Sequence, residues 1–395
     1  MIYLAIDHVD PVSRRPMPNG IPLSQHALIE QMDGHRLDYP RLLYYTKQCR
    51  IPRQMYTPAD APNGAWYPMV LGWFDFEADY MNMISTAAYR RIQQKQIKLV
   101  FTYHEGDSPA RIRARLDQLC SQHDIDPAQV WLISGNSTAD TVFNCVYWPE
   151  LEFMYWRTVK HDATAQYHTQ PRSRHFTALC RIDKLWRSVF MSDLWAQDLH
   201  KSGYFSYTQH LLGNENDYYG CALSNPYLKQ KQSQVDQFIA AGPFRVDNLD
   251  AAAHNDYAHN MTDMYSDSYF NVVLETMIDV DGTSGVFATE KTFKPIINNQ
   301  FFIPVSSAGH QAHLRELGYK TFGRVIDEHY DTITNNQQRF EAVLVETKRL
   351  ATMPLDQLHD IYCTLAPEIQ HNSQIFRAGV AHRLRAVCDR INSPQ

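Results

Sequence analysis

The pattern of hydrophobic and polar positions predicts a layered α/β protein. In the first half of the chain, short apolar runs typical of strands alternate with stretches of helical periodicity. A helix is predicted from Pro109, with Ser108 as its N-cap, because Ile112, Leu116 and Leu119 share one helical face. Strands joined by helices predict a mostly parallel sheet, with a ligand site beyond the carboxyl ends of the strands. The predicted strands are residues 2–6, 66–74, 97–103, 130–134 and 151–156.

The second half of the chain repeats this alternation after a polar tract, residues 160–174, that lacks periodicity. We therefore predict two domains, residues 1–170 and 171–395. Two Rossmann-like domains facing each other across a cleft are the simplest assembly of this order of elements. A second polar tract, residues 248–267, is interpreted as a loop. The predicted strands of this half are 175–180, 268–276 and 301–307, and the predicted helices are 184–199, 289–299, 309–318, one around 340–350 and one over 375–391.

Composition and charge restrict the function. The 395 residues are 44% hydrophobic and 20% charged, which excludes a disordered chain. A net charge of −6 excludes a global basic field for nucleic acid. The basic clusters at 89–95 and 111–115 leave modified DNA open as an acceptor, although solvated helix faces are the ordinary explanation.

The location of the protein is predicted from its cysteines and apolar runs. The seven cysteines are scattered and form no CxxC pair, which indicates reduced, mostly buried thiols. No apolar run approaches the roughly 20 residues of a membrane span. The amino-terminal residues are typical of a first strand and not of a signal peptide. We therefore expect a cytoplasmic protein without a membrane span.

The segment from residue 268 to residue 305 carries the most chemical information. Glu275 and Thr276 end a predicted strand, so their side chains belong to the carboxyl edge of the sheet. Thr289, Glu290 and Lys291 then begin a helix, and helix amino termini attract phosphate. Lys294, one turn later, adds a second positive charge, and Glu290 can accept hydrogen bonds from ribose hydroxyls. This set of residues suits a sugar nucleotide.

Two sequence stretches resemble a known family. FNVVLET (270–276) and FATEKTFKPI (287–296) resemble the donor-binding signature of the α-1,3-fucosyltransferases and their bacterial and viral relatives. Residues 314–340 also resemble uncharacterised, often phage-encoded proteins with that domain. The resemblance implies a GT-B glycosyltransferase with an acceptor-binding amino-terminal domain, a donor-binding carboxyl-terminal domain and a UDP- or GDP-linked sugar as donor. It implies that Glu290 contacts the ribose, Lys291 contacts the diphosphate and Glu275 lies beneath the donor.

Further roles follow from the same resemblance. A basic residue early in the second domain is expected at the diphosphate, and Arg187 is preferred over Lys184 and Arg181. The catalytic base, which removes the acceptor proton without a metal, is expected after the strand 97–103, at Glu105 or, as a second choice, Asp107. Inverting transfer is the expected outcome. The acceptor hydroxyl stays open between a glycan, a protein and a modified nucleobase, and the stretch DVDGTSG leaves the donor sugar open.

Other interpretations of these motifs involve metals or binding alone. Asp279 and Asp281 form a DxD that could hold a metal-bound diphosphate, as in GT-A enzymes. A glycine-terminated loop is preferred because the helix with Thr289 follows directly. His310 and His313 lack companion ligands, so we expect surface histidines and no metal. A non-catalytic nucleotide-binding protein is the alternative from another functional class.

Overall fold

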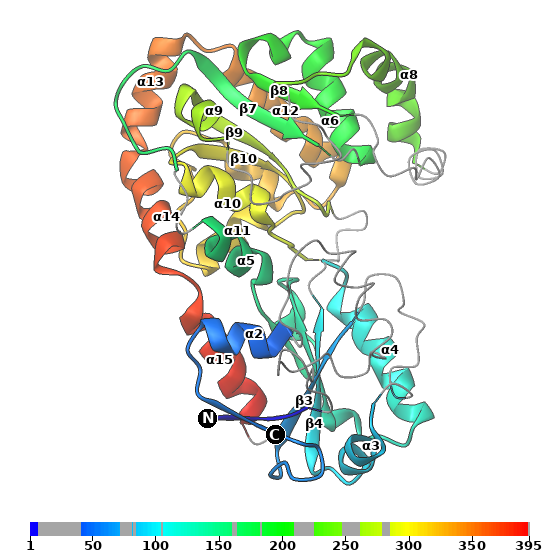
Figure 1. Ribbon diagram of the computed structural model, residues 1–395. Coiled ribbons are helices and arrows are strands. Elements are labelled where there is room, and N and C mark those ends of the chain that lie inside the picture. The colour runs from blue at the N-terminus through cyan, green and yellow to red at the C-terminus, as the bar shows by residue number, and fades with distance from the viewer. Residues whose placement is uncertain are drawn as a thin grey trace. The chain divides into compact units, whose positions relative to one another are not determined.

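The computed structural model describes residues 1–6, 41–71, 81, 84–103, 106–159, 164–181, 184–208, 225–246, 261–278 and 285–393. They belong to two compact units, one of residues 1–150 with 380–395 and the other of residues 151–379 (Figure 1). These limits differ from the predicted ranges 1–170 and 171–395. The chain divides before the polar tract and not within it, and the carboxyl-terminal segment belongs to the first unit.

The first unit is built on a six-stranded sheet in the order β2-β1-β3-β4-β5-β6. Each neighbouring pair of strands is parallel. The strands are β1 (Ile2–Ala5), β2 (Arg53–Tyr56), β3 (Ala65–Val70), β4 (Ile97–Tyr103), β5 (Val130–Ser134) and β6 (Cys145–Tyr147). The helices are α2 (Arg41–Gln48), α3 (Thr86–Gln93), α4 (Pro109–Gln122), α15 (Ala381–Asn392) and the 3₁₀ turns η2 (Pro127–Gln129) and η3 (Ala139–Thr141).

Four of the five strands predicted in the first half are present, as β1, β3, β4 and β5. The helix predicted from Pro109 is α4, although the Ser108 side chain makes no capping hydrogen bond. Helix α15 returns to this unit, where the Trp66 indole donates to Asn392 Oδ1 at 3.1 Å. Because that contact joins residues at opposite ends of the chain, the sequence pattern could not predict it.

The strand predicted at residues 151–156 is wrong, because helix α5 (Glu150–Val159) stands there. Short apolar runs fit either a strand or a buried helix. Glu152, Tyr155 and Val159 are buried, a spacing of three and four residues that only a helix produces. Glu152 also accepts a hydrogen bond from the Tyr319 hydroxyl, a contact within the second unit.

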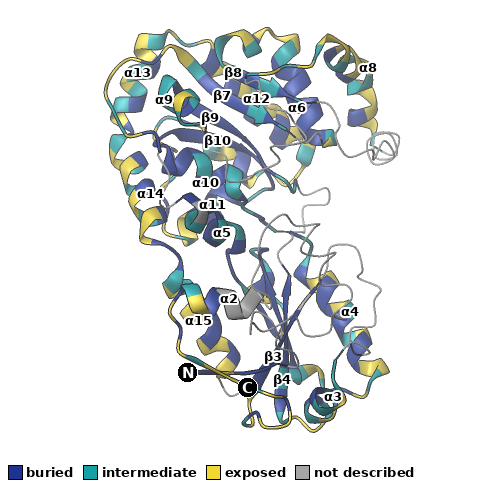
Figure 2. Cartoon of the chain, viewed as in Figure 1, coloured by how far each residue is buried: buried dark blue, intermediate teal, exposed yellow. Residues whose placement is uncertain are grey.

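The second unit contains a four-stranded parallel sheet in the order β10-β9-β7-β8. Its strands are β7 (Arg174–Cys180), β8 (Tyr204–Tyr207), β9 (Ser268–Leu274) and β10 (Phe301–Val305). Its further helices are α6 (Leu185–Ala196), η4 (Leu199–Ser202), α8 (Pro226–Ala241), α9 (Thr262–Asp267), α10 (Glu290–Ile297), α11 (His310–Glu316), η5 (Glu328–Thr332), α12 (Asn336–Ala351), α13 (Leu355–Thr364) and α14 (Ala366–Ala378). Every residue of β9 and β10 is buried (Figure 2).

Most elements predicted in the second half are present, with two differences. Helix α9 occupies the end of the polar tract interpreted as a loop, and residues 248–260 of that tract lie outside the described part. The helix predicted over 375–391 is divided between α14 and α15 at Gly379, which has φ +78° and ψ 172°. An L side chain is strained in that conformation, so the helix ends there.

The order of strands in the second unit creates a switch point between β7 and β9. From β7 the chain crosses over through α6 to β8 on one side, and from β9 it crosses through α10 to β10 on the other. Right-handed crossovers in opposite directions place α6 and α10 on opposite faces of the sheet. The amino ends of both helices follow the carboxyl ends of the two central strands, where open parallel sheets bind their ligands.

Candidate functional site

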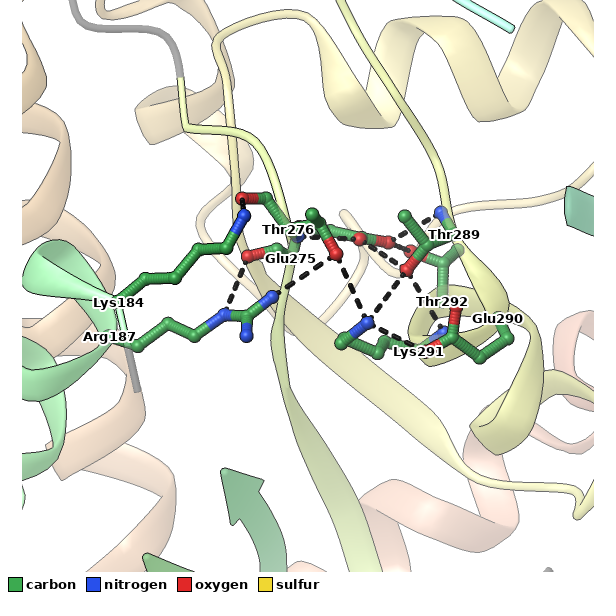
Figure 3. A network of polar contacts seen from close by, with 8 residues as sticks. All are labelled: Lys184, Arg187, Glu275, Thr276, Thr289, Glu290, Lys291 and Thr292. Carbon is green, nitrogen blue, oxygen red and sulfur yellow. Dashed lines mark hydrogen bonds and ion pairs between the residues drawn. The ribbon is translucent and has the colours of Figure 1, made fainter. Parts of the chain in front are cut away.

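The candidate site lies at the carboxyl edge of β7 and β9, and its residues come from the two crossovers that leave those strands. Lys184 and Arg187 belong to the start of α6, and Glu275 and Thr276 follow β9. Residues 289–292 begin α10. Figure 3 shows these eight side chains in one polar network. The structure thus brings together residues from sequence positions about 100 apart, all but one of which the sequence had singled out.

Glu275 lies at the base of the network and is fully buried. Its Oε1 accepts from the Thr289 amide at 3.0 Å and from the Thr292 hydroxyl at 2.6 Å. Its Oε2 accepts from the Thr289 hydroxyl at 2.7 Å and from the Thr276 amide at 3.1 Å. Four donors to one carboxylate offset the cost of burying its charge. Glu275 therefore fixes the amino end of α10 against the end of β9.

The amino end of α10 is capped by the side chains of Thr289 and Glu275. The Thr289 hydroxyl accepts from the Lys291 amide at 3.3 Å, while the Thr289 amide itself is bound to Glu275. These two backbone groups are the kind that bind phosphate at an open helix terminus. Because protein oxygens occupy them, side chains must contribute most of any anion binding at this end of α10.

Three cationic side chains converge on Thr276. Lys291 Nζ and Arg187 Nη2 donate to its Oγ1 at 3.1 Å and 3.2 Å, and Lys184 Nζ donates to its carbonyl oxygen at 3.3 Å. Arg187 is also held by a 2.9 Å bond from its Nε to the Glu275 carbonyl oxygen. It is 3% exposed, so it is not the surface residue of an ordinary amphipathic helix. Positive charge is therefore concentrated where the strand ends.

Glu290 moderates this positive charge. Its Oε1 lies 2.6 Å from Lys291 Nζ, and the two side chains are 15% and 30% exposed. Burial raises the pKa of Glu290, but the charges of Lys291 and Lys294 outweigh it and hold the pKa below the ordinary value of 4.5. Glu290 is thus an ionised acceptor at neutral pH. A ligand phosphate at Lys291 would compete with it for the ammonium group.

A buried histidine extends the network inward, and the sequence did not predict its place. Glu275 Oε1 accepts from Thr292, and Thr292 Oγ1 lies 3.1 Å from His310 Nε2. His310 Nδ1 lies 2.9 Å from Ser306 Oγ. The expectation of surface histidines is wrong, because His310 and His313 are 1% and 5% exposed. The available signal was that Ser306 lies at the end of the predicted strand 301–307 and that His310 follows this strand end by three residues.

The proposed catalytic bases are less well defined. Glu105 lies outside the described residues. The Asp107 carboxylate accepts from the Tyr103 hydroxyl and from Arg111 Nη2, the latter at 3.3 Å. The Asn136 amide donates to the Gly106 carbonyl at 2.7 Å and so ties the loop after β4 to the loop after β5. Asp107 therefore belongs to a polar cluster at the carboxyl edge of the first sheet.

The alternative sites gain no support from the described residues. Asp279 and Asp281 lie outside them. Within the described ranges, no group of three or more His, Cys, Asp or Glu side chains could hold a metal ion. No described helix is long and apolar enough to cross a membrane.

The basic clusters considered for nucleic acid are partly engaged within the protein. Arg91 Nη1 donates to the carbonyl oxygen of Pro58 at 2.8 Å. Arg113 is 3% exposed and bonds to Asp117 and to the Val130 carbonyl. Arg113 is therefore not the solvated side chain expected from the sequence, whereas Arg90, Lys95 and Arg111 are exposed as expected.

Comparison with known proteins adds no assignment. No protein-family model matches the chain, and no curated protein matches it.

Proposed function

We propose that residues 151–379 bind the diphosphate of a nucleotide sugar at the carboxyl edge of β9, and that the protein is a metal-independent glycosyltransferase. The observation that carries the proposal is the convergence of Lys291 and Arg187, from two different helices, on the Thr276 hydroxyl. Two cations held on one neutral oxygen at a switch point form a site for a dianionic ligand group. The resemblance of 270–276 and 287–296 to fucosyltransferase signatures supports the same proposal.

The roles of the side chains follow from their charges. Lys291, Arg187 and Lys184 would bind the diphosphate and stabilise it as it leaves the sugar. Lys294 would add to the positive potential from one turn further along α10. Glu290 would accept from the ribose hydroxyls once the phosphate takes its place at Lys291. Glu275 and Thr289 would hold the loop and helix in position beneath the donor.

The acceptor side of the reaction is proposed from the sequence alone. A carboxylate, Glu105 or Asp107, would remove the proton of the acceptor hydroxyl, and inverting transfer would follow. A glycan, a protein and a modified nucleobase are the acceptor classes to test. Replacing Glu105 and Asp107 separately by glutamine and asparagine tests which carboxylate acts: the correct one must abolish transfer while donor affinity stays unchanged.

A non-catalytic nucleotide-binding protein is the second candidate, and one observation favours it. Asp107, the described candidate base, is already bound to Tyr103 and Arg111. Such a protein would bind nucleotide diphosphates without turnover. Incubating the full chain with a panel of UDP- and GDP-linked sugars, with and without EDTA, and measuring donor hydrolysis distinguishes the two functions.

Titration calorimetry with UDP and GDP tests the binding site directly. Lys291→Ala removes one charge-assisted contact of about 1.5–3 kcal/mol, so the affinity for the preferred nucleotide should fall about ten- to a hundredfold. Lys348→Ala is the matched control, because Lys348 is an exposed lysine of α12 in the same unit. Equal affinities of wild type and Lys291→Ala would refute this site.

A further inference from the structure

We infer that His310 is a positioning residue for the proposed donor site, acting through Thr292 on Glu275. The inference rests on the proposed function for the ligand, but the proton order that underlies it follows from the hydrogen bonds alone. All three side chains are at most 1% exposed, so their polar groups bond to one another and not to surface solvent. His310 takes no part in the roles assigned above.

The direction of each hydrogen bond that links Glu275, Thr292, His310 and Ser306 can be assigned by starting from the carboxylate. An ionised carboxylate only accepts, so the single proton of the Thr292 hydroxyl points to Glu275 Oε1, at 2.6 Å. Thr292 Oγ1 must then accept from His310 Nε2, at 3.1 Å. Burial lowers the pKa of His310, although Glu275 and Asp331 raise it, so the imidazole is neutral. A neutral ring with a proton on Nε2 accepts at Nδ1, from Ser306 Oγ at 2.9 Å.

This order of protons matters for the site above it. A threonine hydroxyl near a helix start can otherwise donate to the backbone carbonyl three or four residues earlier. With Nε2–H directed at its oxygen, Thr292 is held as a donor to Glu275 Oε1. The same oxygen accepts from the Thr289 amide at 3.0 Å, at the first turn of α10. His310 therefore fixes the rotation of the Glu275 carboxylate and, through it, the place of Lys291.

The series of hydrogen bonds from Ser306 to Glu275 also affects the negative charge on the Glu275 carboxylate. A buried anion directly below a phosphate site opposes phosphate binding, unless neutral donors draw its charge away from the ligand. Ser306, His310 and Thr292 form a line of aligned donors that ends on Glu275 from the interior side. Removing the Nε2–H donor should leave more negative charge on the Glu275 carboxylate, including Oε2, to which the Thr276 amide and Thr289 hydroxyl donate.

The test compares His310→Leu, which removes the donor, with His310→Gln, whose amide can donate from nearly the same position. Thr292→Val removes the hydroxyl and keeps the shape of the side chain. His313→Leu is the matched control, because His313 is buried in the same helix and contacts Glu316. Two quantities are measured on the full chain: nucleotide diphosphate affinity by calorimetry, and amide exchange of Thr289 and Lys291 by NMR or mass spectrometry.

The expected result is a loss of about threefold to tenfold in affinity for His310→Leu and Thr292→Val, the size of one weakened hydrogen bond to a charged group. Exchange at Thr289 should accelerate by a similar factor, and His310→Gln should restore both quantities toward wild type. The double variant, His310→Leu with Thr292→Val, should lose no more affinity than either single variant. Both substitutions interrupt the same series of hydrogen bonds. ¹⁵N NMR of wild type should show the proton of His310 on Nε2.

Several results would overturn the inference. They are an Nδ1–H tautomer, unchanged exchange at Thr289 in both single variants, or equal effects of His310→Leu and His313→Leu. If wild type binds no nucleotide, the proposed function fails. The tautomer and the exchange rates then still decide whether His310 positions the amino end of α10.

Discussion

Glu275→Gln is the substitution that tests the described network most directly. The carboxylate accepts four hydrogen bonds, two at each oxygen. An amide of the same shape has one oxygen and one NH₂ group. The Thr289 amide bonds to Oε1 and the Thr276 amide bonds to Oε2. Whichever way the new amide is turned, its NH₂ group faces a backbone N–H, and a backbone amide cannot turn to accept.

The magnitude follows from what each donor loses. A threonine hydroxyl that faces the NH₂ group can accept from it and so loses less than a backbone N–H, although the proton of Thr292, which His310 directs at residue 275, would then lose its partner. One backbone N–H, either the buried amide of Thr289 or the partly buried amide of Thr276, loses a bond to a charged acceptor, about 1.5–3 kcal/mol, and the lack of a partner adds about 1–3 kcal/mol where that amide stays buried. Relief of the buried charge offsets part of this cost. We expect the free energy of unfolding of the 151–379 unit to fall by about 2–4 kcal/mol, or about 5–15 °C in Tm.

Calorimetric unfolding of the full chain, read at the transition of that unit, measures this loss. Glu290→Gln is the control, because Glu290 is partly exposed and its ion pair with Lys291 should contribute about 1 kcal/mol or less. Hydrogen exchange should also rise at Thr276 or Thr289, but not across the sheet. A Glu275→Gln protein that unfolds within a degree of wild type would refute the assigned hydrogen bonds.

Three further outcomes are expected. At pH 8 iodoacetamide should label Cys363 first among the described cysteines, as peptide mapping would detect. Cys363 is half-buried, whereas the other five described cysteines are buried, and burial raises the pKa of four of these five. Because Lys291 lowers the pKa of Glu290 despite burial, Glu290 stabilises the fold fully above about pH 4.5 and loses this effect as the pH falls through its lowered pKa. The difference in urea stability between wild type and Glu290→Gln should therefore shrink on acidification, and a growing difference would contradict the sign. Gly379→Ala should lower the unfolding free energy by about 2–4 kcal/mol in a urea titration, since φ is +78° and a Cβ would lie 2.9 Å from Trp156; an unchanged midpoint would contradict the backbone geometry. The raised cysteine pKa values are about 11 for Cys49 and Cys120 and about 12 for Cys145 and Cys388.

The local pattern alone was enough to predict the α/β class and most strands. Apolar runs such as 97–103 and 130–134 are β4 and β5 with the same limits. Strand type is readable because a strand buried on both faces needs a continuous apolar run. The run at 151–156 shows the limit of this rule, because an equally apolar run forms α5 once its buried residues follow a helical spacing.

The candidate site was predicted in residue identity but not in connectivity. Glu275, Thr289 and Lys291 could be singled out because they flank a strand end and a helix start close together in sequence. Their contact with Arg187 requires that β9 pairs with β7 and not with β8. This strand order depends on residues that are far apart in the sequence. No local periodicity encodes that choice.

Tertiary structure alone decided which polar groups are buried. The sequence around His310 suggested a surface histidine, yet the side chain is 1% exposed, and its burial is tolerated because Ser306 and Thr292 satisfy both of its ring nitrogens. Hydrophobic patterning predicted the type and approximate position of most strands, since these depend on neighbouring residues. The packing of α10 and α11 at one edge of the sheet determined the hydrogen-bond partners, since burial of a polar group is tolerated only where distant segments supply them.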